Sequence, residues 1–146
     1  MIDAIIGVDP GRGTGFALWW KAGLVVCELG EKEVSPKLRD TLDSLQGLTV
    51  AIACERYTVL PGRRVQTSQP HAQRICGAVQ GIATLYNVPC KLQAAGTAKK
   101  IAPPKLLKRI GWWHPTKDMH QVNATQHILL YTAIEFPDYF AELVGI

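Results

Sequence analysis

Two carboxylates in this chain each stand directly after a short apolar run, and they are the first groups that could do chemistry. Asp9 follows the run at residues 5–8 and precedes a Pro-Gly pair that turns the chain, and Glu55 follows the run at residues 48–54. Short β-branched apolar runs predict buried strands, so both acids are expected at strand ends. An acid held beside a glycine-rich turn suits metal or phosphate chemistry, although Asp-Pro-Gly is also an ordinary turn sequence that Asp9 would only cap.

A late helix carries the other polar side chains that could join these acids. The pattern predicts it over residues 118–134, beginning near Asp118, which would form a capping box with Gln121. Its spacing places three polar side chains on one face: His120, Asn123 and His127. A lone helix histidine is usually structural, but here two carboxylates lie upstream, so we expect His120 to bind metal. For His127 we expect a structural role or support of a ligand.

Together these groups form the donor set that a two-metal phosphodiesterase needs. Hard oxygen ligands on neighbouring strand ends, with donors from a late helix, would hold two Mg²⁺ or Mn²⁺ ions about 4 Å apart. One ion would activate water and the other would stabilise the leaving oxygen. The expected metal ligands are Asp9, Glu55, His120 and Asn123.

The elements that must position these residues can be predicted from apolar periodicity and turn residues. In chain order they are strands at 5–9, 16–20 and 23–29, a helix at 31–46, a strand at 48–55, a helix at 69–86, a strand at 87–93, at most short helices within 95–109, and the helix at 118–134. Gly13 and Gly15 flank Thr14 in the first hairpin, where we expect them to supply unusual backbone angles. Ser35 and Pro36 are predicted to begin the helix at 31–46.

The middle of the chain is basic. The net charge is +4, but between residues 51 and 121 lysines and arginines face only two acids, Glu55 and Asp118. Such a field attracts phosphate backbones, unless the charges are scattered in space and only aid solubility. We expect residues 95–109 to form the main nucleic-acid surface, and residues 56–69 to form an exposed loop.

The candidate DNA-binding residues combine this basic region with side chains nearer the carboxylates. They are Arg12, Tyr57, Arg63, Arg64, Arg74, Lys99, Lys100, Lys105 and Lys108. Tyr57 could stack on an unpaired base, and packing into the core is an equally open role.

Composition excludes several classes of protein. At 146 residues, with 47% hydrophobic and 19% charged residues, the chain is expected to form one globular domain over residues 1–146 rather than a disordered segment. The four cysteines form no C-x-x-C pair, so a cysteine zinc site is not expected, and free thiols fit a reducing compartment. Membrane-length apolar runs and a leader peptide are missing, so we expect a cytoplasmic protein of a bacterium or a phage-infected host.

Four motifs in order, G-V-D-P-G-R-G-T-G-F, A-C-E, G-A-V-Q-G-I-A and H-Q-V-N-A, resemble those of RuvC-type Holliday-junction resolvases of the ribonuclease-H-like superfamily, in a short form similar to phage versions. The resemblance extends to about residue 133. It implies an α/β, ribonuclease-H-like fold: a five-stranded mixed sheet flanked by helices, whose first three strands form an antiparallel meander. It also implies a homodimeric, Mg²⁺- or Mn²⁺-dependent endonuclease that acts on four-way junctions, forks and flaps. Gly77 and Gly81 would make the helix at 69–86 its interface.

The resemblance also assigns residues. Asp9 matches the first-strand aspartate that bridges both metals, and Glu55 matches the glutamate after the fourth strand. His120 and Asn123 fall on the H-x-x-D-A pattern of the last helix. Lys99 lies where the family has a basic residue proposed to act near the scissile phosphate. The resemblance therefore implies five catalytic residues: Asp9, Glu55, His120, Asn123 and Lys99.

Asn123 departs from the family pattern, which has aspartate at this position. A neutral amide is a poorer ligand for a hard divalent cation than a carboxylate. Three explanations stay open: a natural variant with a weaker site, a binding protein that has lost cleavage, or a deliberate Asp→Asn change. Asp118 could replace the missing acid, but its capping position and its offset from Asn123 direct it elsewhere.

Two alternatives to a nuclease follow from the same residues. The first is a protein that binds branched DNA and cleaves it weakly or not at all. The second treats residues 7–15 as the phosphate loop of an actin-like or sugar-kinase ATPase. Such ATPases need two related domains and a second phosphate loop, which 146 residues without a repeat of the motif do not provide.

Overall fold

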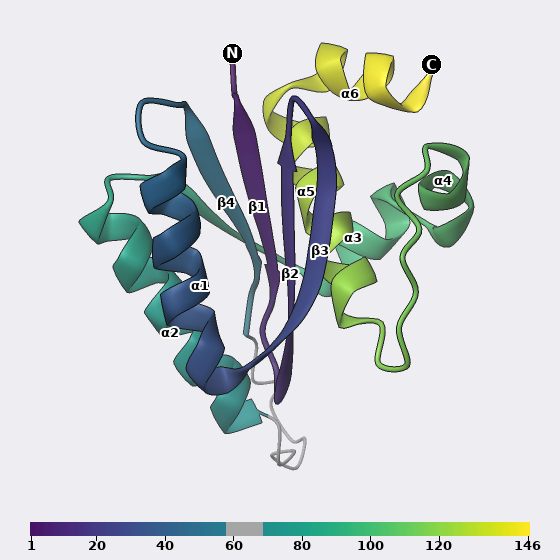
Figure 1. Cartoon of the computed structure of the whole chain (residues 1–146). Coiled ribbons are helices and arrows are strands. Elements are labelled where there is room, and N and C mark those ends of the chain that lie inside the picture. The colour runs from purple at the N-terminus through teal and green to yellow at the C-terminus, as the bar shows by residue number, and fades with distance from the viewer. Residues whose placement is uncertain (58–68) are drawn as a thin grey trace.

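The chain folds around a five-stranded mixed sheet, seen in a computed structural model that describes residues 1–57 and 69–146 (Figure 1). The strands are β1 (Ala4–Asp9), β2 (Gly13–Trp20), β3 (Gly23–Gly30), β4 (Val50–Glu55) and β5 (Cys90–Gln93). Their order across the sheet is β3-β2-β1-β4-β5. β1, β2 and β3 pair antiparallel, whereas β4 runs parallel to β1 and β5 parallel to β4. The predicted α/β fold, with its mixed sheet and antiparallel meander, is confirmed.

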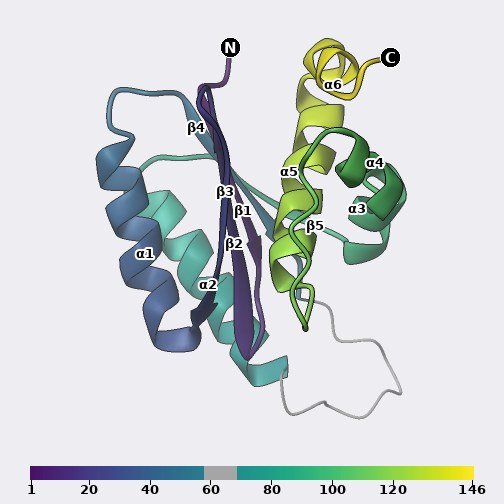
Figure 2. The same ribbon diagram turned by 45° about the vertical axis from the view of Figure 1, so that its right-hand side comes forward.

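Helices cover both faces of this sheet. They are α1 (Glu31–Ser44), α2 (Gln69–Leu85), α3 (Ala95–Ile101), α4 (Pro104–Arg109), α5 (His120–Glu135) and α6 (Pro137–Val144). Figure 2 shows α1 and α2 on one side of the sheet and α3, α4 and α5 on the other. The sequence predicts at most short helices within residues 95–109, and the structure has α3 and α4 there. In the part of the chain that the structure describes, no helix is long and apolar enough to cross a membrane.

The alternation of side chains along β1 and β4 decides which residues meet α5. Ile6 and Val8 of β1 and Cys54 of β4 pack in the core beneath α1 and α2. Residues one position away point to the opposite face, because successive strand side chains alternate. Asp9 and Glu55 therefore both end their strands on the face that α5 covers.

Two glycines let α5 lie almost on the backbone of the sheet. A Cβ at Gly7 would come 2.1 Å from the carbonyl oxygen of Ala124, and one at Gly15 would come 1.9 Å from that of His120. The prediction that Gly13 and Gly15 supply unusual backbone angles is wrong: neither has a positive φ, and both belong to β2. At Gly15 the missing side chain serves instead the close approach of the helix that carries His120.

Two helices begin elsewhere than predicted. α1 begins at Glu31, because the Gly30 N–H donates to Glu33 Oε1 (2.9 Å) and caps the helix, so Pro36 lies inside it and not in its first turn. α5 begins at His120 after Met119, whose left-handed backbone (φ 60°) ends the preceding segment. The predicted capping box is therefore wrong, since Asp118 lies one residue before the N-cap. α6, for which the sequence pattern predicts no element, packs Phe140 and Leu143 against the core on the α5 side.

Candidate active site

The carboxylates of Asp9 and Glu55 converge at the C-terminal ends of two parallel strands. Val8 pairs with Cys54 in the ladder, so the next residues, Asp9 and Glu55, lie side by side beneath α5. The Asp9 side chain is 5% exposed and that of Glu55 27% exposed. The two groups are close enough to shift each other's pKa. Carboxylates pointing apart would have removed the basis for a metal site.

Asp9 is held as a buried anion by two donors from α5. His120 Nδ1 lies 3.0 Å from Asp9 Oδ2, and Asn123 Nδ2 donates to the same oxygen at 3.1 Å. Burial acts to raise the pKa of Asp9, but its side-chain interactions with His120, Glu55 and Asn123 outweigh burial and hold that pKa below its usual value. The hydrogen bond to Asp9 in turn raises the pKa of His120.

Glu55 has the opposite electrostatic environment. Burial raises its pKa, and the neighbouring Asp9 carboxylate raises it further. His127, whose Nε2 lies 3.2 Å from Glu55 Oε2, partly offsets this shift. The site thus places an ionised carboxylate, Asp9, beside a second carboxylate, Glu55, whose ionisation is unfavourable. A divalent cation between the two would favour ionisation of Glu55.

Three residues that the sequence analysis did not place at the site also reach it: Glu28, Asp118 and Gln93. Glu28 and Asp118 each bring one ligand atom to within 4.8 Å of each other and of a ligand atom of His120. Asp118, expected to point elsewhere, thus lies beside His120. Glu28 was missed because its place depends on strand register: Glu28 pairs with Gly15 in the ladder, and Gly15 lies beneath His120.

Gln93 is the third addition, at the end of β5. It pairs in register with Glu55, and its amide lies 2.9 Å from His127 Nδ1. Three neighbouring parallel strands thus end in a row of polar residues, Asp9, Glu55 and Gln93. His127 is 1% exposed and contacts Glu55, so it lies behind one of the two carboxylates.

The basic residues predicted to bind DNA divide between two faces. On the α5 side, α3 and α4 carry Lys99, Lys100, Lys105 and Lys108, all exposed. Three of them join Arg109 around one shallow pocket: Lys100, Lys105 and Lys108. Lys108 Nζ lies 5.0 Å above the Trp113 ring. The charges of residues 100–109 therefore do gather in space.

The other candidates lie apart from this basic pocket. Arg12 is exposed in the β1–β2 turn, next to the strand end that carries Asp9. Arg74 on α2 forms a bidentate ion pair with Glu31 of α1 (2.6 and 3.1 Å), on the face opposite α5. Tyr57 packs against the core on that same face. Arg63, Arg64 and most of the predicted loop at 56–69 lie outside the described residues.

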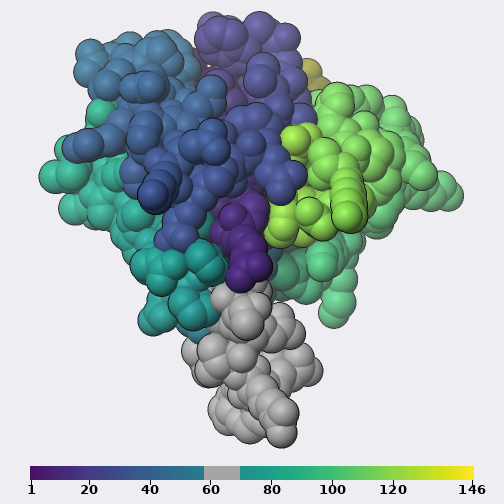
Figure 3. Space-filling view, turned by 60° about the horizontal axis from the view of Figure 1, so that its bottom comes forward, coloured from purple at the N-terminus to yellow at the C-terminus, as the bar shows by residue number. Residues whose placement is uncertain are grey.

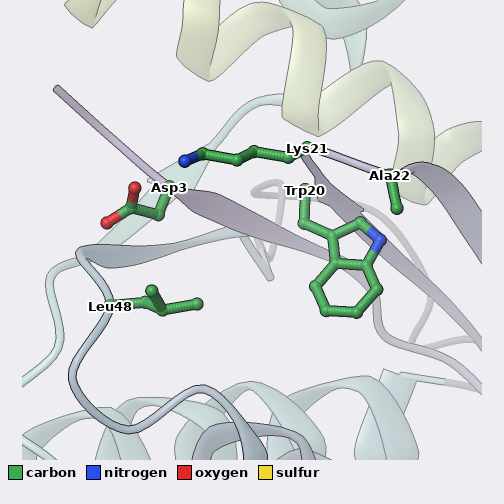
Figure 4. Close-up of a pocket in the computed structure, with 5 residues that line it drawn as sticks. All are labelled: Asp3, Trp20, Lys21, Ala22 and Leu48. Carbon is green, nitrogen blue, oxygen red and sulfur yellow. The ribbon is translucent and has the colours of Figure 1, made fainter.

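Figure 3 looks onto the end of the molecule where the purple β1–β2 turn lies beside the light-green segment that leads into α5. The turn lies close to the first residue of α5, since a Cβ added at Gly13 would come 3.5 Å from the His120 ring. A separate pocket, lined by Asp3, Trp20, Lys21, Ala22 and Leu48, lies at the opposite end of β1 (Figure 4). It has no carboxylate pair and no histidine in its lining. The candidate site, with its carboxylate pair, therefore lies at the C-terminal ends of β1 and β4, away from this pocket.

The fold is of the ribonuclease-H-like type, a mixed sheet in the order β3-β2-β1-β4-β5 with helices on both faces. No family model matches the sequence, and no curated protein matches it. Among solved structures, Thermus thermophilus RuvC in complex with a Holliday junction substrate matches with a TM-score of 0.69 and 14% identity, covering 98% of this chain and 96% of that chain. A second structure of T. thermophilus RuvC matches with a TM-score of 0.61 and 15% identity, covering 97% and 96%. The fold is therefore that of a RuvC-type resolvase, as the motifs predicted.

Proposed function

We propose that this protein is a metal-dependent, structure-selective DNA endonuclease that resolves Holliday junctions and other branched DNA. The observation that carries the proposal is the convergence of Asp9 and Glu55 beneath α5, with His120 and Asn123 bound to Asp9. The match to RuvC, solved with a Holliday junction substrate, supports the choice of DNA. The activity would belong to the cytoplasm of a bacterium or of a phage-infected host.

The donor set fits one or two Mg²⁺ or Mn²⁺ ions. Asp9 and Glu55 offer hard carboxylate oxygens, His120 an imidazole nitrogen and Asn123 an amide oxygen. The pKa of Glu55, raised by burial and by Asp9, indicates a site that gains from a bound cation. When bound, the ions would supply an activated water and stabilise the leaving oxygen.

The protein's own groups would prepare this reaction. α5 closes over the strand ends and keeps Asp9 away from water, so that its charge acts in a medium of low dielectric. Asn123 donates through Nδ2 to Asp9, which orients the amide and leaves Oδ1 as its ligand atom. His120 and Glu55, with side chains 25% and 27% exposed, are donors that substrate could reach more directly than the buried Asp9.

DNA would lie across the exposed basic residues of α3 and α4, and Lys99 would act near the scissile phosphate. A four-way junction is resolved by two symmetric cuts, which two copies of one active site could make. We therefore propose a homodimer through α2. Gly77 and Gly81 support this interface, because a Cβ at either would meet nothing within 4 Å and neither glycine is needed inside the chain.

A second candidate is a branched-DNA-binding protein with little or no cleavage. The observation that favours it is Asn123, which places a neutral amide donor against Asp9 where the family has a carboxylate. Both candidates predict the same binding, and they differ only in cutting.

One assay separates the two. The given protein and Asn123→Asp would be incubated with labelled four-way junctions and flaps in Mg²⁺ or Mn²⁺, with Asp9→Asn as the inactive control and EDTA as the metal-free control. Nicking by Asn123→Asp alone would indicate an impaired enzyme, and nicking by both an active one. Junction binding without nicking by either chain would defeat the nuclease proposal.

A further inference from the structure

The strand ends of the site form a polar row that continues beyond the two acids. β4 lies between β1 and β5, and Glu55 of β4 pairs in register with Gln93 of β5. Only Glu55 of these two could reach a cation through a carboxylate. A buried glutamine at the next strand end therefore needs a different reason, and the residue above it on α5 provides one.

His127 lies between Gln93 and Glu55 and touches both. Its Nδ1 is 2.9 Å from the Gln93 amide, and its Nε2 is 3.2 Å from Glu55 Oε2. At 1% exposure the imidazole is out of reach of DNA. Any effect of His127 on the reaction must therefore pass through Glu55.

The backbone of α5 decides how the Gln93 amide is oriented. The amide nitrogen of Gln93 lies 3.0 Å from the carbonyl oxygen of His127, and the amide oxygen of Gln93 lies 3.2 Å from the backbone nitrogen of Tyr131. A carbonyl only accepts and an N–H only donates, so both contacts form with the amide in this orientation alone. The same amide nitrogen then donates to His127 Nδ1.

This donation fixes the tautomer of His127. A neutral imidazole has one nitrogen that donates and one that accepts. Because Nδ1 accepts from Gln93, Nε2 carries the proton and points it at Glu55 Oε2. The other tautomer would place the Nε2 lone pair against the Glu55 carboxylate.

We propose that His127 is a positioning residue for Glu55 and that Gln93 sets the tautomer in which it acts. The N–H of His127 occupies Oε2 and fixes the side-chain rotamer, so that Oε1 is the oxygen presented to the cation beside Asp9. This inference rests on the proposed function, in which Glu55 binds Mg²⁺ or Mn²⁺. Outer partners that orient a metal ligand typically change metal affinity by about 10- to 100-fold when removed.

Two substitutions of the same chemistry test the proposal. The amide nitrogen of a glutamine side chain reaches as far as Nε2 of histidine, whereas that of an asparagine reaches only as far as Nδ1. His127→Gln can therefore still donate to Glu55, and His127→Asn cannot. Mn²⁺ binding is measured by titration calorimetry on the full chain, with unfolding temperature as the control for folding.

The expected result is a Mn²⁺ affinity within about threefold of the parent for His127→Gln and about 10- to 100-fold weaker for His127→Asn. A merely structural histidine would give equal losses of stability and equal Mn²⁺ affinities in the two variants, and that result would overturn the proposal. A Mn²⁺ affinity unchanged in His127→Asn would overturn it as well.

A second measurement does not depend on any variant folding. In ¹⁵N-histidine-labelled parent protein, the nitrogen shifts of His127 should show a protonated Nε2 and an unprotonated Nδ1, and Gln93→Leu should abolish this preference. A protonated Nδ1 in the parent would overturn the proposal even if the protein cuts junctions. Conversely, Mn²⁺ binding with the expected tautomer but no cleavage by Asn123→Asp would defeat the nuclease assignment and leave this inference standing.

Discussion

His120 Nδ1 lies 3.0 Å from Asp9 Oδ2, which ties the first turn of α5 to the C-terminal end of β1. This contact spans most of the chain and joins the two elements that the site requires. Because Asp9 is an ionised acceptor, the hydrogen lies on Nδ1. The rest of the imidazole is then directed to the side where Glu28 and Asp118 gather.

The Asp9–His120 hydrogen bond predicts that the free energy of unfolding is largest in mildly acidic solution. The pKa of Asp9 is lowered from 3.8, so its contribution is present above 3.8 and is lost as the pH falls through the lower folded value. The pKa of His120 is raised from 6.5, so its contribution is present below 6.5 and is lost as the pH rises through the higher folded value. The pair therefore stabilises the metal-free protein most between pH 3.8 and 6.5.

The measurement is the free energy of unfolding in urea against pH, for the parent and for His120→Asn. The asparagine amide can still donate to Asp9 but does not titrate, so the decline above pH 6.5 should shrink in the variant. His120→Asn leaves every other ionisable side chain in place, so the comparison isolates the imidazole. Identical slopes above pH 6.5 would contradict the role given to His120.

The glycines beneath α5 give a second prediction. Gly7→Ala and Gly15→Ala would each drive a Cβ into a helix carbonyl, at 2.1 and 1.9 Å, so α5 must move away from the strand ends. Overpacking of this kind typically destabilises by about 1–3 kcal/mol. Thermal unfolding should show this loss, and Mn²⁺ affinity should fall with it because His120 and Asn123 move with the helix.

Gly96→Ala is the matched control, since a Cβ at this helical glycine of α3 meets nothing within 4 Å. It should be neutral or stabilise by up to about 1 kcal/mol. Should Gly7→Ala and Gly15→Ala melt like Gly96→Ala, α5 does not lie as close to the sheet as the structure has it.

The strand-end acids could be predicted from the sequence because both signals are local. An apolar run, a carboxylate and a turn residue stand next to each other at Asp9. The alternation of side chains along the strand then decides which face of the sheet the carboxylate lies on. Glu28 and Gln93 could not be predicted this way, since their places depend on the registers Gly15 to Glu28 and Glu55 to Gln93. Register is a property of pairs of strands, and neither partner shows it alone.

The same distinction explains the helix ends and the partner of Arg74, which residue type alone did not predict. Charge makes Arg74 a candidate phosphate contact, and only the packing of α1 against α2 shows that Glu31 also pairs with it. The N-cap of α1 is a glycine, which has no capping side chain, and the N-cap of α5 is a left-handed methionine, so the usual capping residues were misleading. A contact with another element decided the partner of Arg74, and backbone hydrogen bonding or conformation decided where the helices begin. Residue type alone predicted neither.

The basic pocket of α3 and α4 predicts how DNA binding responds to salt. Lys100→Gln and Lys105→Gln each remove one exposed charge from this pocket. If each lysine meets a phosphate, the slope of log affinity against log salt should fall by about 0.9 per substitution on duplex arms. Fluorescence anisotropy with a labelled four-way junction, in EDTA, measures binding without cleavage.

Lys37→Gln, an exposed lysine of α1 on the other face, is the control and should leave the salt slope unchanged. A response to Lys37→Gln equal to that of the α3 and α4 variants would mean that net charge alone attracts the DNA. The choice of α3 and α4 as the binding surface would then be wrong.

The open glycines of α2 give the last prediction, on assembly. Gly81 is exposed in the single chain, so Gly81→Glu can be accommodated there without a clash. In a homodimer through α2 the same side chain would meet the partner helix, so light scattering after gel filtration should show a dimer for the parent and a monomer for the variant. Gly96→Glu introduces the same charge at an open glycine of α3 and should stay dimeric. A Gly81→Glu protein that remains dimeric, with an unchanged unfolding temperature, would exclude this stretch of α2 from the interface. A monomeric parent would mean that separate molecules cut the two sites of a junction.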